Sequence, residues 1–233
     1  MLTLHLAACS KGGVLPIATQ RPAGATAHLV LGSRPGPCPP AALPRLSAGT
    51  RLRGEAGRDL LLVTGHAWLC AADGGHALFC PLVRACTDLP AGRIALEPVR
   101  EGLSLAWITL SDRGSLGLRE DASGPAMEEM VRERLDVGHA QGYLLPDDPA
   151  RLRALITALA LDEGYDLVLT SGGTGVAPSD LTPEATSRVL DRELPGFAQA
   201  MMQASLAKTP MGAISRAKAG IVGRTLVINL PGS

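Results

Sequence analysis

Between Leu103 and Leu230, short apolar runs alternate with stretches whose apolar residues recur at helical spacing. Strands are predicted at four of these runs: Leu103–Leu110, Gly142–Leu145, Asp166–Thr170 and Arg224–Leu230. Helices are predicted from Ser123, from Pro149 behind the N-cap Asp148, from Thr182, and over Pro195–Leu206. Strands that alternate with helices of this length are typical of βαβ units, so we expect an α/β domain with a mainly parallel sheet.

The first hundred residues have a different character, with short apolar runs bounded by glycine or proline. These runs predict short strands at Leu2–Leu6, Ala27–Leu31, Leu60–Thr64, Ala67–Ala71 and Ala77–Cys80. Residues 22–49 are rich in proline, glycine and alanine, which favours a loop or an irregular edge. No helix of reliable length is predicted before residue 100. We therefore expect two domains, a small β-rich domain over residues 1–100 and an α/β domain over residues 101–233.

The composition excludes several classes of function. The chain has 22 basic and 22 acidic residues, and this balance argues against nucleic-acid binding. No stretch approaches the roughly 18 apolar residues of a membrane span, so no membrane partner is expected. The five cysteines are odd in number and none has Cys-x-x-Cys spacing, which favours reduced thiols in a cytoplasmic protein over disulfides or a zinc site.

Polar or glycine-rich residues follow each predicted strand of the α/β domain. In an open parallel sheet, ligands bind outside the carboxyl ends of the strands. We therefore expect these residues to line one crevice: Ser111 and Asp112 after the first strand, Asp147 after the second, the stretch from Ser171 to Asp180 after the third, and Pro231, Gly232 and Ser233 after the last.

The turn Ser171-Gly-Gly-Thr-Gly175 can serve as a ligand loop. Gly172, Gly173 and Gly175 allow positive φ and close approach of a ligand, and Ser171 and Thr174 add hydroxyl donors. Backbone N–H groups in such a loop, close to a helix N-terminus, form a nest for anions. The loop is not a Walker P-loop, because no Gly-Lys-Ser/Thr follows. Taken alone, the motif leaves open an ordinary strand-to-helix turn.

Two aspartates in separate turns, Asp147 and Asp180, are expected to face the same crevice. Bare carboxylates would repel phosphates, and carboxylates together with substrate phosphate commonly hold Mg²⁺, so we expect both residues to bind Mg²⁺. The alternatives are a helix cap for Asp180 and a plain turn residue for Asp147. Arg216 either reaches a phosphate or lies on the surface. His139, beside a glycine in an expected surface turn, receives no catalytic role.

The stretch Leu169-Thr-Ser-Gly-Gly-Thr-Gly175, followed by Asp180-Leu-Thr-Pro-Glu-Ala-Thr186, strongly resembles the molybdopterin adenylyltransferases of the MogA/MoaB type. Matches to this family continue in order over residues 103–233: Ser111-Asp-Arg113, Asp121-Ala-Ser-Gly-Pro125, Leu145-Pro-Asp147, Glu193-Leu-Pro-Gly-Phe197, Ala213-Ile-Ser-Arg216, Ala219-Gly-Ile221 and Asn229-Leu-Pro-Gly-Ser233.

The resemblance implies a three-layer α/β sandwich, a homotrimer and an activity. The activity is transfer of the adenylyl group of ATP to molybdopterin, with Mg²⁺ and with release of pyrophosphate. It also implies that Asp147 and Asp180 are essential. The glycine loop and the final loop Pro231-Gly-Ser233 would line the pterin and nucleotide site.

Two departures from the family pattern leave an alternative open. Ser179 stands where family members often carry a basic residue, and the chain stops at Ser233, where relatives usually continue with a helix and a strand. A C-terminal truncation is therefore expected. The alternative function is a non-catalytic molybdopterin carrier or scaffold. A general nucleotide hydrolase has little support, since no residue is an evident water-activating base.

Three stretches of the first domain, Cys9-Ser-Lys-Gly-Gly13, Gly49-Thr-Arg-Leu-Arg53 and Cys80–Val99, look like a reduced MOSC domain. MOSC domains are β-rich modules of molybdenum-cofactor sulfuration and transfer enzymes. The resemblance implies partners among such enzymes and makes Cys80 or Cys70 the thiol to test. The alternative is a small β unit that only packs against the other domain, with both cysteines in its core.

Overall fold

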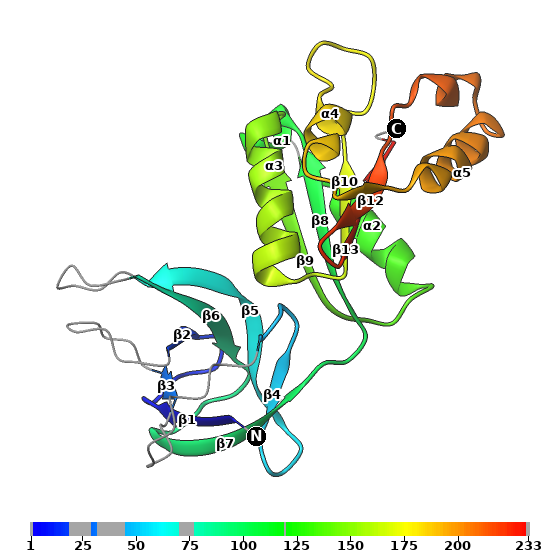
Figure 1. Ribbon diagram of the computed structural model, residues 1–233. Helices are drawn as coiled ribbons and strands as arrows, with labels where there is room; N and C mark the ends of the chain where they lie inside the picture. Colours follow the sequence, from blue (N-terminus) through cyan, green and yellow to red (C-terminus); the bar gives the residue numbers. More distant parts are fainter. Residues whose placement is uncertain (1, 19–28, 32–44, 70–76, 119, 232–233) are drawn as a thin grey trace. The chain divides into compact units, whose positions relative to one another are not determined.

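The computed structural model describes residues 2–18, 29–31, 45–69, 77–118 and 120–231. The chain divides into two compact units, residues 1–101 and 102–233 (Figure 1). Cys70, Gly232 and Ser233 lie outside the described ranges, as do most of residues 22–49 and the ends Ala27 and Ala71 of two expected strands. Within those ranges, no helix is both long and apolar enough to cross a membrane.

Seven strands of the N-terminal unit close into a β-barrel in the order β1-β3-β2-β6-β5-β4-β7. All neighbours are antiparallel except β2 and β3, which are parallel. The interior is aliphatic, with Leu4, Leu52 and Val83 fully buried. The strands are β1 (Leu2–Leu6), β2 (Val14–Ala18), β3 (Leu29–Leu31), β4 (Arg51–Arg53), β5 (Asp59–Leu69), β6 (Leu78–Ala85) and β7 (Gly92–Val99).

The barrel differs from the expected strands in three places. The runs expected at Leu60–Thr64 and from Ala67 belong to one long strand, β5, which continues through a register shift between Val63 and Gly65. The run at Ala77–Cys80 begins the longer strand β6. Strands β2, β4 and β7 were not predicted, because proline or charged residues interrupt their apolar pattern.

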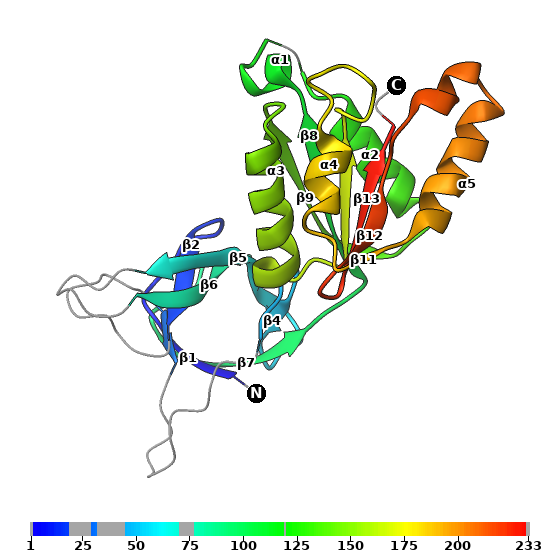
Figure 2. The same ribbon diagram turned by 45° about the horizontal axis from the view of Figure 1, so that its top comes forward.

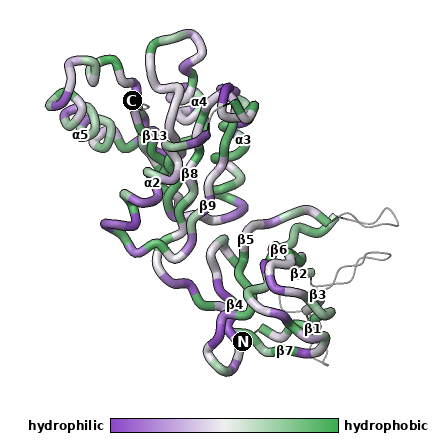
Figure 3. Tube along the Cα trace, turned by 180° about the vertical axis from the view of Figure 1, so that it is seen from behind, coloured by the Kyte–Doolittle hydropathy of each residue, from purple (hydrophilic) through white to green (hydrophobic). Residues whose placement is uncertain are grey.

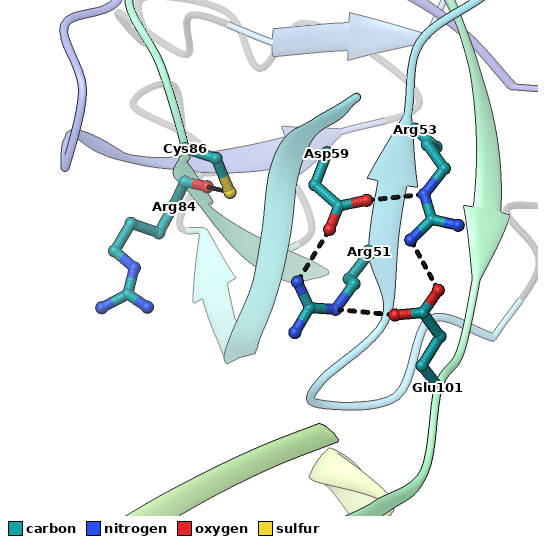
Figure 4. A network of polar contacts seen from close by, with 6 residues as sticks. All are labelled: Arg51, Arg53, Asp59, Arg84, Cys86 and Glu101. Atoms are coloured by element: carbon teal, nitrogen blue, oxygen red, sulfur yellow. Dashed lines mark hydrogen bonds and ion pairs between the residues drawn. The ribbon is translucent and has the colours of Figure 1, made fainter. Parts of the chain in front are cut away.

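A ring of ion pairs fixes one end of the barrel (Figure 4). Asp59 accepts from Nη1 of Arg51 and from Nε of Arg53, both at 2.7 Å. Glu101, the last residue of the unit, is 2.7 Å from Nη2 of Arg53 and 3.8 Å from Nε of Arg51. The two side chains of β4 thus tie the start of β5 to the end of the N-terminal unit.

The C-terminal unit is built on a six-stranded sheet in the order β11-β12-β13-β10-β8-β9. The four strands β13, β10, β8 and β9 run parallel, and β12 and β11 add an antiparallel edge. The strands are β8 (Leu103–Leu110), β9 (Val137–Leu145), β10 (Leu167–Ser171), β11 (Arg192–Glu193), β12 (Ala219–Val222) and β13 (Thr225–Leu230). Figure 3 shows hydrophobic residues concentrated on the central strands of this sheet.

Helices cover both faces of the sheet and give the three layers (Figure 2). Met127 of α2 packs with Leu105, Leu167 and Leu169 on one face. The other face carries the fully buried Ile108, and α3 and α4 lie over it. The helices are α1 (Asp112–Ser115), α2 (Ser123–Arg132), α3 (Pro149–Thr157), the π-helical η1 (Ala158–Glu163), α4 (Thr182–Ser187), α5 (Pro195–Leu206) and the 3₁₀ turn η2 (Pro210–Ile214).

The expected mainly parallel sheet and three-layer arrangement are confirmed, and two details differ. Strand β9 begins at Val137, so His139 lies in a strand and not in a surface turn. Its Nε2 is 3.2 Å from Oη of Tyr165. Tyr165 itself is almost fully buried. The antiparallel strands β11 and β12 were also missed, because two to four residues carry too little periodicity to recognise.

Candidate functional site

The four parallel strands of the C-terminal unit, β13, β10, β8 and β9, end at one edge of the sheet, which we call the rim. Ser171 of β10 pairs with Thr109 of β8 on one side and with Leu230 of β13 on the other. Leu110 of β8 pairs with Leu145 of β9, and the N–H of Ser111 donates to the carbonyl of Leu145 at 2.9 Å. The turns that follow these strands therefore start side by side.

Asp112 and Asp147 join two of these turns by reciprocal hydrogen bonds. The N–H of Asp147 donates to Oδ1 of Asp112 at 3.0 Å, and the N–H of Asp112 lies 3.4 Å from Oδ2 of Asp147. Ser111 caps the short helix α1, because its Oγ accepts from the N–H of Gly114 at 3.1 Å. The structure thus brings together three residues that the sequence predicted for the site.

The carboxylate of Asp147 is disfavoured in its ionised form. Partial burial is the largest cause that raises its pKa, and the negative charges of Asp112 and Asp180 raise it further, while the N–H of Asp112 opposes the change. Asp147 and Asp180 follow β9 and β10, which both pair with β8, so the turns that carry them start at the same edge of the sheet.

Two glycines of the loop after β10 are needed for its conformation, and the third leaves room for Asp180. Gly172 and Gly173 have φ of +106° and +62°, where residues with a side chain are strained. A Cβ on Gly172 would lie 2.5 Å from the carbonyl oxygen of Leu110, and one on Gly175 would lie 2.8 Å from Oδ2 of Asp180. The glycines hence let the loop press against β8 and against Asp180.

Helix α4 and Arg216 hold this loop from two sides. Oγ1 of Thr182 donates to the carbonyl of Gly172 at 2.9 Å. Nε of Arg216 donates to the carbonyl of Gly175 at 2.8 Å, and its Nη2 donates to the carbonyl of Asp180. The Nη1 of Arg216 pairs with Glu184 of α4. Arg216 therefore contacts the loop backbone, and is not simply a surface residue.

The remaining predicted residues are less open than the sequence suggested. Ser171 and Thr174 are 8% and 5% exposed, so little of either hydroxyl-bearing side chain reaches solvent. Pro231 is half-buried directly after β13, whereas Gly232 and Ser233 lie outside the described residues. Asp148 is a helix cap as predicted, since its Oδ1 accepts from the N–H groups of Ala150 and Arg151.

Asp121 was not recognised as a candidate from its surroundings in the sequence. Its Oδ1 accepts from the N–H groups of Ser123 and Gly124, both at 3.0 Å, and thereby caps α2. Its Oδ2 accepts from Oγ1 of Thr109 at 2.9 Å, near the end of β8. The Asp-x-Ser spacing before a helix was the signal that could have identified this cap.

The carboxylates at the rim suit a hard cation that also contacts substrate. Among the residues that the structure describes, no group of three or more His, Cys, Asp or Glu is arranged to hold a metal by itself. Mg²⁺ usually takes one or two carboxylates, together with waters and substrate phosphates. Asp147 and Asp180, two carboxylates in the turns after β9 and β10, fit that mode of binding.

The family model described as "Probable molybdopterin binding domain" matches residues 106–233, more than half of the chain. The molybdopterin adenylyltransferase of Escherichia coli K12 is 39% identical over 131 residues, which are 56% of this chain and 67% of that protein. The molybdopterin adenylyltransferase of Haemophilus influenzae is 38% identical over 131 residues, 56% of this chain and 66% of that protein. The chain thus spans about two thirds of the length of these curated relatives.

Comparison with solved structures points to the same family. The molybdopterin biosynthesis enzyme MoaB from Thermus thermophilus superposes with a TM-score of 0.52 and 46% identity, over 56% of this chain and 82% of that one. A structure of MogA has a TM-score of 0.52 and 38% identity, over 56% of this chain and 84% of that one. The sheet and helices of the C-terminal unit are therefore of the MogA type.

Proposed function

Because this chain belongs to the family of probable molybdopterin binding domains, we propose that it transfers the adenylyl group of ATP to the terminal phosphate of molybdopterin. The products are adenylyl-molybdopterin and pyrophosphate. One observation carries the proposal: Asp147 and Asp180 lie in the turns after β9 and β10, which both pair with β8 and end at one edge of the sheet, and Oδ2 of Asp180 lies against Gly175 of the glycine loop. The relatives from Escherichia coli and Haemophilus influenzae are named molybdopterin adenylyltransferases, which supports the same reaction.

In the proposed reaction, a phosphate oxygen of molybdopterin attacks the α-phosphorus of ATP. The bond from this phosphorus to the oxygen that bridges to the β-phosphate breaks, and the electron pair leaves with pyrophosphate. Attacker and target are both anionic, so the protein mainly has to position them and neutralise charge. This chemistry needs no nucleophile from the chain.

Different residues of the rim would position the two substrates and neutralise their charge. The N–H groups of Gly172–Gly175 would donate to phosphate oxygens, and the absence of Cβ atoms lets the phosphates approach the backbone. Asp147 and Asp180 would hold Mg²⁺, which when bound offsets the charge of the phosphates. Asp112 orients Asp147 through the pair of hydrogen bonds between their turns.

The alternative is a molybdopterin carrier or scaffold that does not turn over. Ser179, at the exposed apex of the glycine loop, favours this alternative, because a basic side chain there would provide a phosphate contact.

We further propose that the protein acts in the cytoplasm as a homotrimer, which light scattering of the purified chain would test. The N-terminal barrel is proposed to be a reduced MOSC-like module. Its buried Cys80, whose pKa is raised by burial, fits a core position better than a reactive one.

Pyrophosphate release measured with ATP, Mg²⁺ and molybdopterin, singly and together, distinguishes these functions. The adenylyltransferase releases pyrophosphate only when all three are present, a carrier releases none, and a hydrolase acts without the pterin. Asp180→Asn keeps an oxygen acceptor for the N–H of Ala177, which now donates at 2.8 Å, so the loop should stay folded. We expect this variant to lose about 10²–10³-fold in turnover, the usual cost of losing one group that stabilises developing charge. Wild-type turnover by Asp180→Asn would refute the metal role.

A further inference from the structure

Arg216 lies in the connection between η2 and β12, and it contacts the loop after β10 at three points and helix α4 at a fourth. Its backbone N–H donates to the carbonyl of Thr174 at 3.1 Å. Its guanidinium donates from Nε to the carbonyl of Gly175 at 2.8 Å and from Nη2 to the carbonyl of Asp180. The fourth contact joins Nη1 to the carboxylate of Glu184 on α4.

Gly175 and Asp180 form the neck of this loop. Between them, the apex residues 176–179 are exposed. The neck is narrow, since a Cβ on Gly175 would stand 2.8 Å from Oδ2 of Asp180. The same Oδ2 accepts from the N–H of Ala177 at 2.8 Å, so the orientation of the carboxylate depends on the backbone around it. The guanidinium of Arg216 spans the neck and holds both sides of it.

We propose that Arg216 is a positioning residue, which fixes the backbone of Asp180 so that its carboxylate is aimed at the metal it shares with Asp147. This inference rests on the proposed function. It differs from both alternatives that the sequence left open, a phosphate contact and a plain surface position, because three of the five N–H groups of the guanidinium, one on each nitrogen, already donate to the protein. The carboxylate of Glu184 also offsets the positive charge that would attract a phosphate.

The geometry of the contacts requires arginine and not merely a positive charge. A planar guanidinium presents donors in a rigid fork and can bond two carbonyls and a carboxylate at once. The ammonium of lysine is compact and flexible, and it cannot bridge the neck in the same way. Residues that orient a metal ligand typically change metal affinity by about 10–100-fold when they are removed.

The test compares Arg216→Lys and Arg216→Ala with the wild-type full-length chain. Mn²⁺ affinity is measured by electron paramagnetic resonance in the presence of α,β-methylene-ATP, which requires no turnover. The Mg²⁺ concentration that gives half-maximal pyrophosphate release, and KM for ATP at saturating Mg²⁺, are measured in parallel. The matched control is Lys218→Ala, because Lys218 is a cation of the same segment whose ammonium binds Glu193 at 3.0 Å and does not contact the loop.

We expect both Arg216 variants to bind Mn²⁺ about 10–100-fold more weakly and to need correspondingly more Mg²⁺. At saturating Mg²⁺ their KM for ATP should stay close to the wild-type value, and Lys218→Ala should behave like wild type. Glu184→Gln should have a milder effect, because the bonds from Arg216 to the two carbonyls remain. If Arg216→Ala fails to fold, the Mn²⁺ affinities of Arg216→Lys and Glu184→Gln still test the proposal.

Three results would overturn the proposal. Wild-type Mn²⁺ affinity in Arg216→Lys would mean that charge alone suffices. A raised KM for ATP that lysine restores would indicate a direct phosphate contact. A lowered Tm with unchanged metal affinity would indicate a purely structural role. The proposed function fails separately: if the wild-type chain releases no pyrophosphate, the Mn²⁺ measurement still decides the role of Arg216.

Discussion

Asp147 and its neighbour Asp148 have opposite environments although they are adjacent in one turn. Asp148 caps α3, and hydrogen bonds from the N–H groups of Arg151 and Ala150 lower its pKa. Asp147 is half-buried beside two other carboxylates, and its pKa is raised. Ionised Asp148 favours the folded state, whereas the folded state disfavours the ionised form of Asp147.

Asp147→Asn should therefore raise the Tm of the metal-free protein at pH 7 while lowering adenylyl transfer by about 10²–10³-fold. A carboxyl whose pKa is higher in the folded state contributes stability below its unfolded pKa, about 3.9, and loses that contribution as the pH rises through the folded value. The gain in Tm should consequently shrink as the pH falls from 7 towards 4. Thermal unfolding followed by circular dichroism over this range measures it.

Asp148→Asn is the matched control for that experiment. The pKa of Asp148 is shifted in the opposite direction, and asparagine is also a good N-cap, so this variant should not raise the Tm. An equal gain in Tm from both substitutions would mean that loss of net negative charge, and not the site around Asp147, produces the effect.

Single residues of the candidate site were predictable where a turn restricts the residue type. Gly172 and Gly173 adopt positive φ in the loop that the sequence marked, and the cap at Asp148 followed from the proline behind it. Arg216 was undecided, because its partners Gly175 and Asp180 are about forty and thirty-six positions away in the chain. The environment of His139 was missed for the same reason, since Tyr165 is 26 positions away, in the connection between η1 and β10.

Helix α2 and strand β9 meet β8 closely because two glycines make room for one indole. A Cβ on Gly124 of α2 would lie 2.2 Å from Nε1 of Trp107, and one on Gly142 of β9 would lie 2.5 Å from its Cε2. Trp107 belongs to the cluster that joins α2 to the sheet. The spacing of these three elements is therefore set by the size of the tryptophan ring.

Gly142→Ala should destabilise the C-terminal unit by about 1–3 kcal/mol, the usual cost of overpacking a core. Chemical unfolding followed by the fluorescence of the chain measures this change. Gly196→Ala is the control, because a Cβ at Gly196 in helix α5 meets nothing within 4 Å and alanine favours a helix. A Gly142→Ala variant as stable as Gly196→Ala would contradict the packing described around Trp107.

At the level of elements, long periodic segments were predicted and short ones were not. Leu103–Leu110 and Pro195–Leu206 have the predicted bounds, because an unbroken apolar run and a proline at the helix start define them. Strand β9 extends five residues before Gly142, since Gly138 and Gln141 hide its apolar pattern. Strand β4, Arg51–Arg53, has only one buried residue, and its arginines are held by ion pairs that no local pattern encodes.

Considered as a whole, the chain combines two units stabilised by different means. The C-terminal sheet is buried on both faces, whereas the barrel adds the ring of Arg51, Arg53, Asp59 and Glu101 to its aliphatic core. The pKa of Asp59 is lowered, chiefly by the hydrogen bond from Arg53 and then by the one from Arg51. Partial burial acts in the opposite direction. Ionised Asp59 hence stabilises the barrel.

Asp59→Asn should lower the Tm of the N-terminal unit at pH 7. A carboxyl with a lowered pKa stabilises the fold above its unfolded pKa, about 3.9, and that contribution disappears as the pH falls through the lower folded value. The difference from wild type should therefore narrow below pH 4 in thermal unfolding experiments. Glu55→Gln removes an exposed carboxylate from the turn between β4 and β5, and serves as control. Equal losses from both variants would argue against a role of the ring.

The central claim is that turns far apart in the chain form one site for a cation and two phosphorylated substrates. A crystal structure of the full chain grown with molybdopterin, α,β-methylene-ATP and Mn²⁺ tests it most directly, because anomalous scattering locates the manganese. We predict a manganese peak bound by the carboxylates of Asp147 and Asp180, with the α-phosphate against Gly172–Gly175. Manganese and phosphates bound elsewhere on the chain, with these residues untouched, would contradict the account.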